Sequence, residues 1–562
     1  MAEPPATQPS AEPLPDGLLE ALRRPTAYPH DPDAAQGVEC VQTHLSVVFL
    51  TRSRVYKIQK AVDLGFVSLL ARARRSALCL REVELNRRLA PAVYLGVAPI
   101  RAIAGGFEVG EPAEGLATTD GSGGRPEHCV VMRRLASGRD ALSLLRVGAL
   151  GETEIDRVAE RVARFHAQTG LGRPAPFSGE DWWARIEQPV QENFRVLEGK
   201  AAAGVSAGTL RIVAERAAQF SLRHRRRFES RRCAGRAVDG HGDLHLQHVW
   251  LEPEAREPIV IDCIAFRDDF RQIDSAADIA FLAMDLAYRG AVRLAERLLA
   301  CYARESDDYD LYGVVDYFAS YRAAVRAKVA ALAAEDASLG PEQRTSARES
   351  IRRHLKLAAE LLREPAAAPL VALCGMIGAG KSTVAHEVAD VLGAVVLSSD
   401  ARRKRLTGIA SKPRERAGWG EGIYSEKCRE RVYRELLECA TPVLGSGRAA
   451  VIDASFARVE WRAMLRRWAD ERAVRVYLIE VRCGQTRTLE RLAHRAQAGH
   501  DASEAGPEHL AQSRRSFQPP QEWPQADRTL VETDGAGWRE SLRHWLRVRV
   551  SASGDDRPQA PA

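Results

Sequence analysis

The sequence predicts a multidomain protein, α+β in its first half and α/β in its second, with a parallel β-sheet between helices in the second half. Three observations carry this prediction. The chain has 562 residues, which is too long for a single hydrophobic core. A glycine-rich loop, Gly375–Thr383, joins an apolar strand to an amphipathic helix. Beyond this loop, short apolar runs alternate with helical segments, as in a parallel sheet covered on both faces.

Composition is that of an ordinary globular protein, with 45% apolar and 28% charged residues. The net charge of +6 is small for this length and does not argue for nucleic-acid or membrane binding. The ten cysteines are scattered without a C-x-x-C pair, which favours a reduced setting without structural zinc. The start of the chain lacks the features of a signal peptide, and no apolar run is long enough to span a bilayer. We expect a cytoplasmic protein.

The first half begins with residues 1–30, predicted to be a mostly disordered tail because Pro, Ala, Ser and Glu dominate its start. Two β-rich runs, Leu45–Leu50 and Arg54–Ile58, predict a hairpin. A helix is predicted over about 69–89, and Gly121–Gly124 predicts a loop within the following strands. Those strands are predicted at 93–100, 107–109 and 129–132.

Helical spacing dominates residues 141–230 and 276–362, with short strands near 249–251 and 259–262 between them. The basic run 224–232 suggests either a polyanion site or a solvated helix face, and the second is favoured. Two prolines make 363–369 a natural linker. We therefore predict one domain over 31–362, a second over 370–550 and a disordered tail over 551–562. Strands of the second domain are predicted at 370–374, 394–397, 449–452, 475–481 and 528–532.

The loop Gly375–Thr383 matches G-x-x-x-x-G-K-[ST] between a strand and a helix. Its glycines, Gly375, Gly378 and Gly380, let backbone N–H groups turn inward around phosphate oxygens, and the helix N-terminus adds its dipole. Lys381 would reach the outer phosphates, and the Ser382 hydroxyl would ligate Mg²⁺ beside Thr383. A glycine-rich turn that binds nothing is the disfavoured alternative. This half is predicted to bind ATP with Mg²⁺.

Acidic residues follow two further strands of this half. Asp400 ends the second strand, where a carboxylate can orient an acceptor hydroxyl while Arg403 holds phosphate oxygens. A helix N-cap is an equal alternative for Asp400. Asp453 ends the third strand, where a second support for Mg²⁺ is expected. Arg491 and Arg495 lie four apart on one helix face and could close over the phosphates, or form a basic solvent face.

Together these stretches resemble the small P-loop kinases of the polynucleotide-kinase and zeta-toxin type. The resemblance rests on Gly375–Thr383, Leu397–Leu406, Val451–Phe456 and Arg491–Ala505. It implies that Asp400 and Arg403 handle the acceptor, that Asp453 serves the metal and phosphate region, and that the two lid arginines belong to a closing segment.

The first half contains His241-Gly-Asp243-Leu-His245-Leu-Gln-His248, followed by Ile259-Val-Ile-Asp262. A loop acid followed about 20 residues later by a strand-end acid can orient an acceptor hydroxyl and hold Mg²⁺ on a triphosphate. A metal site built on the histidines is a weaker interpretation, because no cysteine or nearby glutamate completes it. The residues could also merely fix a loop.

This arrangement resembles the aminoglycoside-phosphotransferase branch of the protein-kinase-like fold over residues 35–360. The resemblance implies Asp243 as catalytic base and Asp262 as Mg²⁺ ligand. It further implies that Lys57 pairs with phosphates, with Glu82 or Glu84 as its helix partner, and that 273–278 carries a structural acid motif. His248 stands where the family has an Asn metal ligand, so it either substitutes as a ligand, is dispensable, or impairs transfer.

The whole chain resembles bacterial two-domain proteins that join such a kinase-like domain to a P-loop kinase or AAA-type ATPase domain. We expect a bifunctional, ATP- and Mg²⁺-dependent kinase acting on hydroxyl groups of small molecules. The alternative is a catalytically silent N-terminal binding module that regulates the P-loop half, because His248 replaces the Asn and no glycine-rich turn precedes Lys57. A nucleic-acid-end kinase is possible from the basic run near Arg403, but the near-neutral charge disfavours it.

Overall fold

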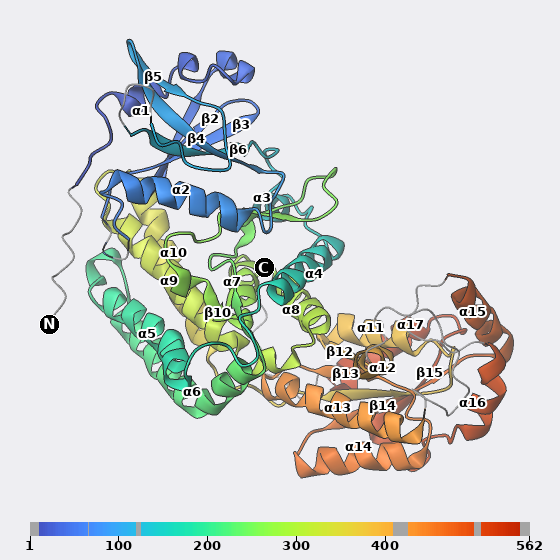
Figure 1. The fold of residues 1–562 in the computed structure, drawn as a ribbon. Helices are drawn as coiled ribbons and strands as arrows, with labels where there is room; N and C mark the ends of the chain where they lie inside the picture. The colour runs from blue at the N-terminus through green and yellow to red at the C-terminus, as the bar shows by residue number, and fades with distance from the viewer. Residues whose placement is uncertain are drawn as a thin grey trace. The chain divides into compact units, whose positions relative to one another are not determined.

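The computed structural model describes residues 11–63, 65, 67–119, 125–407, 425–498 and 507–550 (Figure 1). The predicted loop at 121–124, residues 1–10, the whole predicted tail 551–562 and residues 499–505 of the Arg491–Ala505 stretch lie outside these residues. The chain forms two compact units. Unit 1 comprises 1–203, 225–289 and 322–347, and unit 2 comprises 204–224, 290–321 and 348–562. These units divide the chain differently from the predicted domains, since the segment 363–369 lies inside unit 2.

Unit 1 contains a six-stranded antiparallel sheet in the order β1-β2-β3-β6-β4-β5. The strands are β1 (Glu39–Gln42), β2 (Ser46–Leu50), β3 (Arg54–Gln59), β4 (Tyr94–Ile103), β5 (Gly106–Val109) and β6 (Glu127–Arg133). The predicted hairpin is β2 and β3, which pair from Ser46 opposite Gln59 to Leu50 opposite Val55. Helix α2 (Arg72–Asn86) lies against β4 and β6, and its apolar face buries Cys79 and Val83.

The prediction of disorder over residues 1–30 is wrong for the described part of that segment. Helix α1 (Leu18–Ala21) and the turns after it pack on the sheet, where Leu18, Leu22 and Tyr28 are buried. Tyr28 also donates a hydrogen bond of 2.6 Å from its hydroxyl to the Leu22 carbonyl. The Pro- and Ala-rich composition of the first residues predicted disorder, but the segment also contains a few apolar residues whose burial on the sheet is enough to order it.

The remainder of unit 1 is helical, as predicted, and carries short two-stranded ladders, of which the one at 249–250 and 259–260 was predicted and the one at 237–239 and 272–274 was not. Its helices are α3 (Ala141–Arg146), α4 (Glu152–Gln168), α5 (Gly179–Glu198) and α7 (Ser275–Tyr288), with parts of α6 (Ala207–Cys233), α9 (Val315–Glu335) and α10 (Pro341–Leu361). The ladders pair β7 (Ala237–Asp239) with β10 (Gln272–Asp274) and β8 (Val249–Trp250) with β9 (Ile259–Val260). An antiparallel sheet with one long helix, followed by a helical part that carries such loops, is the protein-kinase-like fold. Among the described residues, no helix is long and apolar enough to cross a membrane.

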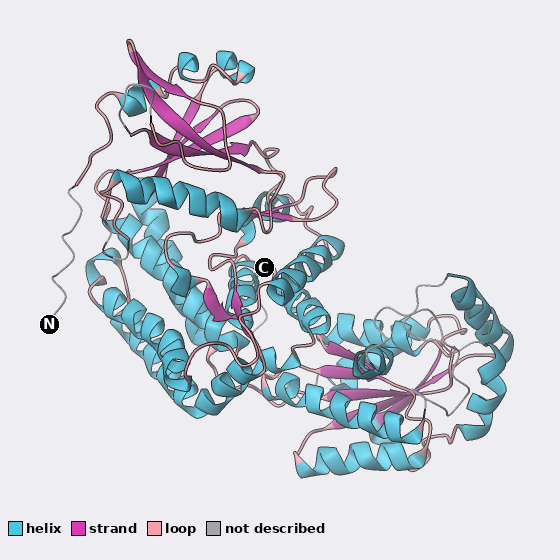
Figure 2. Cartoon of the chain, viewed as in Figure 1, coloured by secondary structure: helices cyan, strands magenta, loops and turns pink. Residues whose placement is uncertain are grey.

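Unit 2 is built on a five-stranded parallel sheet in the order β12-β13-β11-β14-β15, with helices on both faces (Figure 2). The strands are β11 (Leu370–Cys374), β12 (Val395–Ser398), β13 (Ala450–Asp453), β14 (Val476–Arg482) and β15 (Arg528–Glu532). All five predicted strands are confirmed to within one residue. One face packs against α11 (Lys381–Leu392) and α17 (Trp538–Trp545), through residues such as Val384, Val388 and Leu542.

Unit 2 also includes α8 (Val292–Ser306) and residues up to Tyr321, which precede the predicted linker. The buried Arg448, just before β13, donates two hydrogen bonds of 2.8 Å to Asp316 and one of 2.6 Å to Glu296. Asp307 at the end of α8 binds Arg402 of α12 (Ser399–Thr407) at 2.8 Å. Ion pairs therefore join this earlier segment to the sheet and to α12 within one unit.

Two candidate nucleotide sites

The phosphate loop lies between the buried strand β11 and the N-terminus of α11, as the sequence predicts. Gly375 approaches the neighbouring strand so closely that a Cβ there would stand 2.3 Å from the Val481 carbonyl oxygen. Gly378 and Gly380 have φ of 69° and 93°, a left-handed backbone that favours glycine. The ammonium group of Lys381 folds over the loop and donates to the Met376 carbonyl at 2.8 Å. The loop thus forms a cradle with a cation above it.

Asp453 ends β13, directly beside β11, and its carboxylate is hydrogen-bonded to the hydroxyl of Ser382. Burial raises the pKa of Asp453, although the nearby Lys381 ammonium acts in the opposite direction. A buried carboxylate next to a hydroxyl is an oxygen-donor pair of the kind that Mg²⁺ prefers, and a cation would compensate its burial. These two residues fit Mg²⁺. Thr383 follows on the exposed first turn of α11.

Asp400 and Arg403 lie on α12, which leaves the sheet next to Asp453. Ser398 is paired with Asp453 across β12 and β13, and α12 starts at the following residue. Arg403 donates to the Asp400 carboxylate at 2.5 Å. Asp400 lies inside the first turn of α12, and the Ser398 hydroxyl accepts the Ala401 N–H at 3.4 Å. An acid and a guanidinium therefore lie beside Asp453 at the carboxyl edge of the sheet, where ligands bind in this architecture.

Arg491, on α15 (Gln485–Ala498), is linked to the phosphate loop through Thr533. Its guanidinium donates to the Thr533 hydroxyl at 2.7 Å, and that hydroxyl donates to the Ala379 carbonyl at 2.8 Å. The sequence analysis missed Thr533, although its place directly after β15 put it at the ligand edge of the sheet. Arg495 lies on the same helix, but its side chain is outside the described residues.

The second candidate site lies in unit 1. Lys57 of β3 donates to Glu82 of α2 at 2.9 Å and to Asp262 at 2.8 Å. Glu84, the alternative partner, instead faces Arg81 on the surface at 3.6 Å. Burial lowers the pKa of Lys57, but the two carboxylates outweigh it and raise that pKa well above its usual value. Lys57, Glu82 and Asp262 thus meet at one point.

Asp278 of α7 fixes the loop that carries Asp243. Its carboxylate accepts the backbone N–H groups of His241 at 2.7 Å and Gly242 at 2.9 Å, and it accepts a hydrogen bond of 3.0 Å from His166. A Cβ on Gly242, whose φ is 83°, would stand 2.8 Å from the Phe270 carbonyl oxygen. Sequence analysis placed a structural acid here but missed His166, which lies in a different helix and has no sequence motif.

Three histidines surround Asp243. His241 donates from Nε2 to the Ile261 carbonyl at 2.9 Å, which makes it a structural residue. His245 Nε2 lies 3.5 Å from the Asp243 carboxylate, and His248 Nε2 lies 3.5 Å from that of Asp262. Burial and the neighbouring His245 lower the pKa of His248 to about 4, so its ring is neutral at pH 7. Burial raises the pKa of Asp243, but the histidines outweigh burial and hold it well below its usual value.

The strand turn that precedes Lys57 carries no glycine. The chain reverses between β1 and β2 at residues 43–45, and the Ser46 N–H donates to the Thr43 hydroxyl at 3.0 Å. The resemblance to the kinase-like family implies a glycine-rich phosphate loop before the strand lysine, and this turn is not one. Backbone N–H groups can close on phosphates there less freely than in the P-loop.

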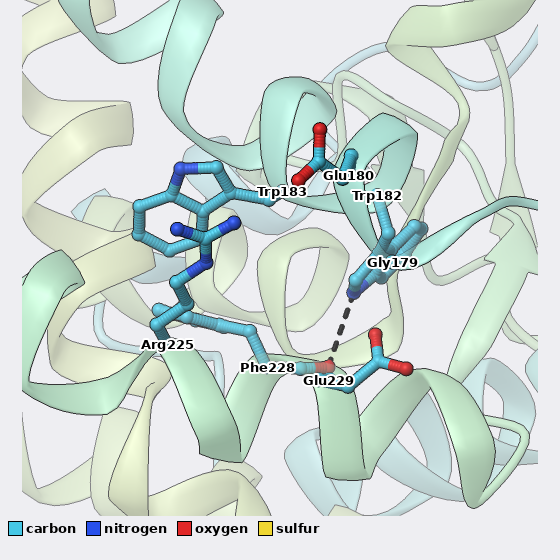
Figure 3. A pocket seen from close by; sticks show the side chains of 7 residues that line it. All are labelled: Gly179, Glu180, Trp182, Trp183, Arg225, Phe228 and Glu229. Atoms are coloured by element: carbon cyan, nitrogen blue, oxygen red, sulfur yellow. Dashed lines mark hydrogen bonds between the residues drawn. The ribbon is translucent and has the colours of Figure 1, made fainter.

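The basic run of α6 forms part of the helix packing. Arg231 is buried and makes a two-point ion pair with Asp274, at 2.9 and 2.8 Å. Arg225 lies over the Trp183 ring, 5.1 Å from its centroid, at the mouth of a pocket of about 260 Å³ (Figure 3). This pocket contains none of the predicted site residues. It is lined by Gly179, Glu180, Trp182, Trp183, Arg225, Phe228 and Glu229.

Comparison with known proteins gives three results. Residues 370–520 match a family model described as an AAA domain. The uncharacterized protein Rv2004c of Mycobacterium tuberculosis is 33% identical over 468 residues, which cover 83% of this chain and 88% of that protein. The uncharacterized protein Mb2027c of Mycobacterium bovis matches with the same identity and coverage.

Several of the solved structures that resemble parts of the chain are described as kinases. The APS kinase CysC of Mycobacterium tuberculosis is 21% identical, covering 33% of this chain and 98% of its own, with a TM-score of 0.25. A gluconokinase of Sinorhizobium meliloti is 18% identical, covering 34% and 96%, with a TM-score of 0.24. A choline/ethanolamine kinase family protein of Mesorhizobium loti is 15% identical, covering 61% and 98%, with a TM-score of 0.34.

Proposed function

We propose that this chain, which belongs to the family of the uncharacterized mycobacterial proteins Rv2004c and Mb2027c, is an ATP-dependent phosphotransferase whose P-loop site phosphorylates hydroxyl groups of small molecules. One observation carries the proposal: the loop cation Lys381, the oxygen pair Ser382–Asp453 and the pair Asp400–Arg403 converge on one sheet edge. In this proposal, phosphate binding, Mg²⁺ binding and orientation of the acceptor hydroxyl are thus carried out by different residues at the same edge of the sheet.

In this proposal each group has one role. The loop N–H groups and Lys381 bind the β- and γ-phosphates, and Ser382 and Asp453 hold Mg²⁺, which when bound neutralises charge on those phosphates. Asp400 accepts a hydrogen bond from the acceptor hydroxyl and orients its oxygen toward the γ-phosphate. Arg403 holds the Asp400 carboxylate in place. Arg491 acts from behind by fixing the loop through Thr533.

ATP turnover in the presence of metabolite pools tests the proposal, with phosphate incorporation as the direct readout. Lys381→Ala should lower turnover about a hundredfold or more, because it removes a cation that faces the transferred phosphate. Asp400→Asn should lower phosphate transfer by a comparable factor and leave ATP affinity unchanged. Asp390→Asn is the matched control, since Asp390 is exposed on α11. Equal turnover by the wild type and Lys381→Ala would refute the proposal.

Acceptor classes can be separated in the same assay. Transfer to a 5′-hydroxyl oligonucleotide, but to no small molecule, would replace the small-molecule acceptor with a nucleic-acid end. The proposal places this protein in the cytoplasm, where ATP is available.

We further propose that the site in unit 1 binds a second nucleotide through Lys57 and Asp262, with Asp243 as catalytic base. The alternative is a silent regulatory module, and two features support it: the glycine-free turn at 43–45 and His248 in place of an Asn. Nucleotide binding and turnover by the full chain carrying Lys381→Ala separate the two. Residual turnover that disappears in Asp243→Asn indicates a second kinase, whereas binding without turnover indicates a silent module.

A further inference from the structure

The metal side of the unit 1 site combines a nitrogen and an oxygen donor. His248 Nε2 lies 3.5 Å from Asp262 Oδ2, while the other carboxylate oxygen of Asp262 accepts from Lys57 at 2.8 Å. The side chain of His248 is largely buried, and that of Asp262 is about half exposed, at 48%. Asp262 therefore offers one free oxygen, on the side that faces the imidazole ring and solvent.

The hydrogen bonds of the two histidines fix their ring nitrogens. His248 Nδ1 lies 2.9 Å from the Asp243 carbonyl oxygen, which can only accept, so Nδ1 carries a proton and Nε2 is the ring nitrogen left to bind a cation. His245 differs, because its Nδ1 accepts the Gln247 N–H at 3.3 Å and its Nε2–H faces Asp243. His248 is thus arranged as a ligand, and His245 as an orienting residue.

His248 Nε2 and Asp262 Oδ2, which face each other at 3.5 Å, are spaced to share one cation. Metals bind imidazole nitrogen at about 2.0–2.1 Å and carboxylate oxygen at about 2.0–2.2 Å, so two neighbouring ligands of one ion stand roughly 3–3.5 Å apart. The backbone carbonyl that holds Nδ1 is the usual outer partner of a metal-bound histidine. The spacing fits one shared dication.

The donor type selects the ion. Mg²⁺ takes oxygen ligands, and the Asp262–His248 pair is not an all-oxygen pair, unlike Ser382–Asp453 in unit 2. First-row transition metals accept imidazole readily, with affinity rising along the series from Mn²⁺ toward Zn²⁺ and Cu²⁺. The two sites of the chain therefore differ in donor chemistry.

We propose that His248 and Asp262 hold a divalent transition-metal ion, rather than Mg²⁺, on the nucleotide at the unit 1 site. The inference rests on the proposed nucleotide binding at this site. It makes His248 a selector of the metal, and it would allow the two sites of one chain to respond to different cations.

Mn²⁺ with a non-hydrolysable ATP analogue is the probe, and the protein is the full chain carrying Lys381→Ala. The analogue should bind at least about tenfold more tightly with Mn²⁺ than with Mg²⁺, and His248→Asn should reverse this preference. Pulsed electron paramagnetic resonance should detect a ¹⁴N coupling to Mn²⁺ that His248→Asn abolishes. His386→Asn is the matched control, because His386 is the histidine beside Ser382 and Asp453.

The outcomes separate the two proposals. Equal affinity with both metals, or a ¹⁴N coupling that is absent from the start or lost only in His386→Asn, would overturn the metal inference alone. A protonated His248 that replaces the ion would give metal-independent binding and would also overturn it. Binding that Lys57→Ala does not weaken in either metal would overturn the proposed nucleotide site, and the inference with it.

Discussion

Replacing Arg448 tests whether the segment 290–321 is an integral part of unit 2. The Arg448 side chain is only 9% exposed and donates to Asp316 and Glu296, whose side chains are 25% and 27% exposed. Arg448→Met keeps most of the packing volume over Tyr312 but leaves both acids without their cation. Breaking a buried pair from one side costs about 3–5 kcal/mol, and the partial exposure of the acids reduces this to about 2–3 kcal/mol.

Urea unfolding of the full chain measures this cost. In a Lys57→Ala background, which removes the proposed unit 1 site, the transition of unit 2 is the one that Mg·ATP shifts to higher urea, because a ligand stabilises the unit that binds it. Asp316→Asn and the double variant complete a cycle, in which we expect a coupling of about 1–3 kcal/mol. Arg472→Met, at an exposed pair with Glu471, is the control and should change stability by less than about 0.5 kcal/mol. An Arg448→Met effect no larger than that control would refute the reasoning.

Three further predictions follow from the two sites. Gly375→Ala should destabilise unit 2 by about 2 kcal/mol or more and weaken ATP binding, because its Cβ would meet the Val481 carbonyl oxygen. The control is Gly393→Ala, which has open space around it and should cost only about 1 kcal/mol. Equal effects of the two substitutions in urea unfolding would contradict this prediction. Asp278→Asn should cost unit 1 about 2–4 kcal/mol and weaken nucleotide binding there, since one amide oxygen cannot accept both loop N–H groups; unchanged unfolding would contradict it. Burial raises the pKa of Asp278, but His166 outweighs burial and lowers that pKa in the folded protein. The Asp278 carboxylate therefore stabilises unit 1 above its pKa in the unfolded chain, near 3.9, and this stabilisation is lost as the pH falls through its lower pKa in the folded protein. The urea stability of unit 1 should therefore fall below about pH 4, and Asp278→Asn should flatten that dependence.

A feature could be predicted from the sequence when the residues that determine it lie close together in the chain. The phosphate loop is contiguous, and each residue from Gly375 to Thr383 has its chemical reason within one turn of chain. The sheet of unit 2 follows from apolar runs of strand length, so the end of the second strand, shortly before Asp400, and the end of the third strand, which carries Asp453, followed as well. The two acids could be placed at one sheet edge without knowing any side-chain contact.

Residues that act through distant contacts could not be predicted in this way. Thr533 and His166 belong to no motif, and their hydrogen bonds join segments more than a hundred residues apart. The packing of Leu18 and Tyr28 depends on an apolar sheet face that a Pro-rich composition does not reveal. For His248 the sequence left several roles open, and the hydrogen bond from Nδ1 to a carbonyl favours the role of a ligand.

The predicted linker at 363–369 lies between the motifs of the two candidate sites, but it is not the boundary between the two compact units. This matters for Asp400 and Arg403, the residues proposed to orient the acceptor at the P-loop site. Helix α12 carries Asp400, and its outer face is held by residues that precede the linker. Arg402 binds Asp307, and Arg405 donates to the Glu305 carbonyl at 2.8 Å. The phosphate loop is supported by β11, α11 and Arg491 of α15, all of which follow the linker, whereas the orientation of α12 also depends on the end of α8. Nucleotide binding and acceptor positioning therefore have different structural supports, so a break in the chain at the linker should impair phosphate transfer more than ATP binding.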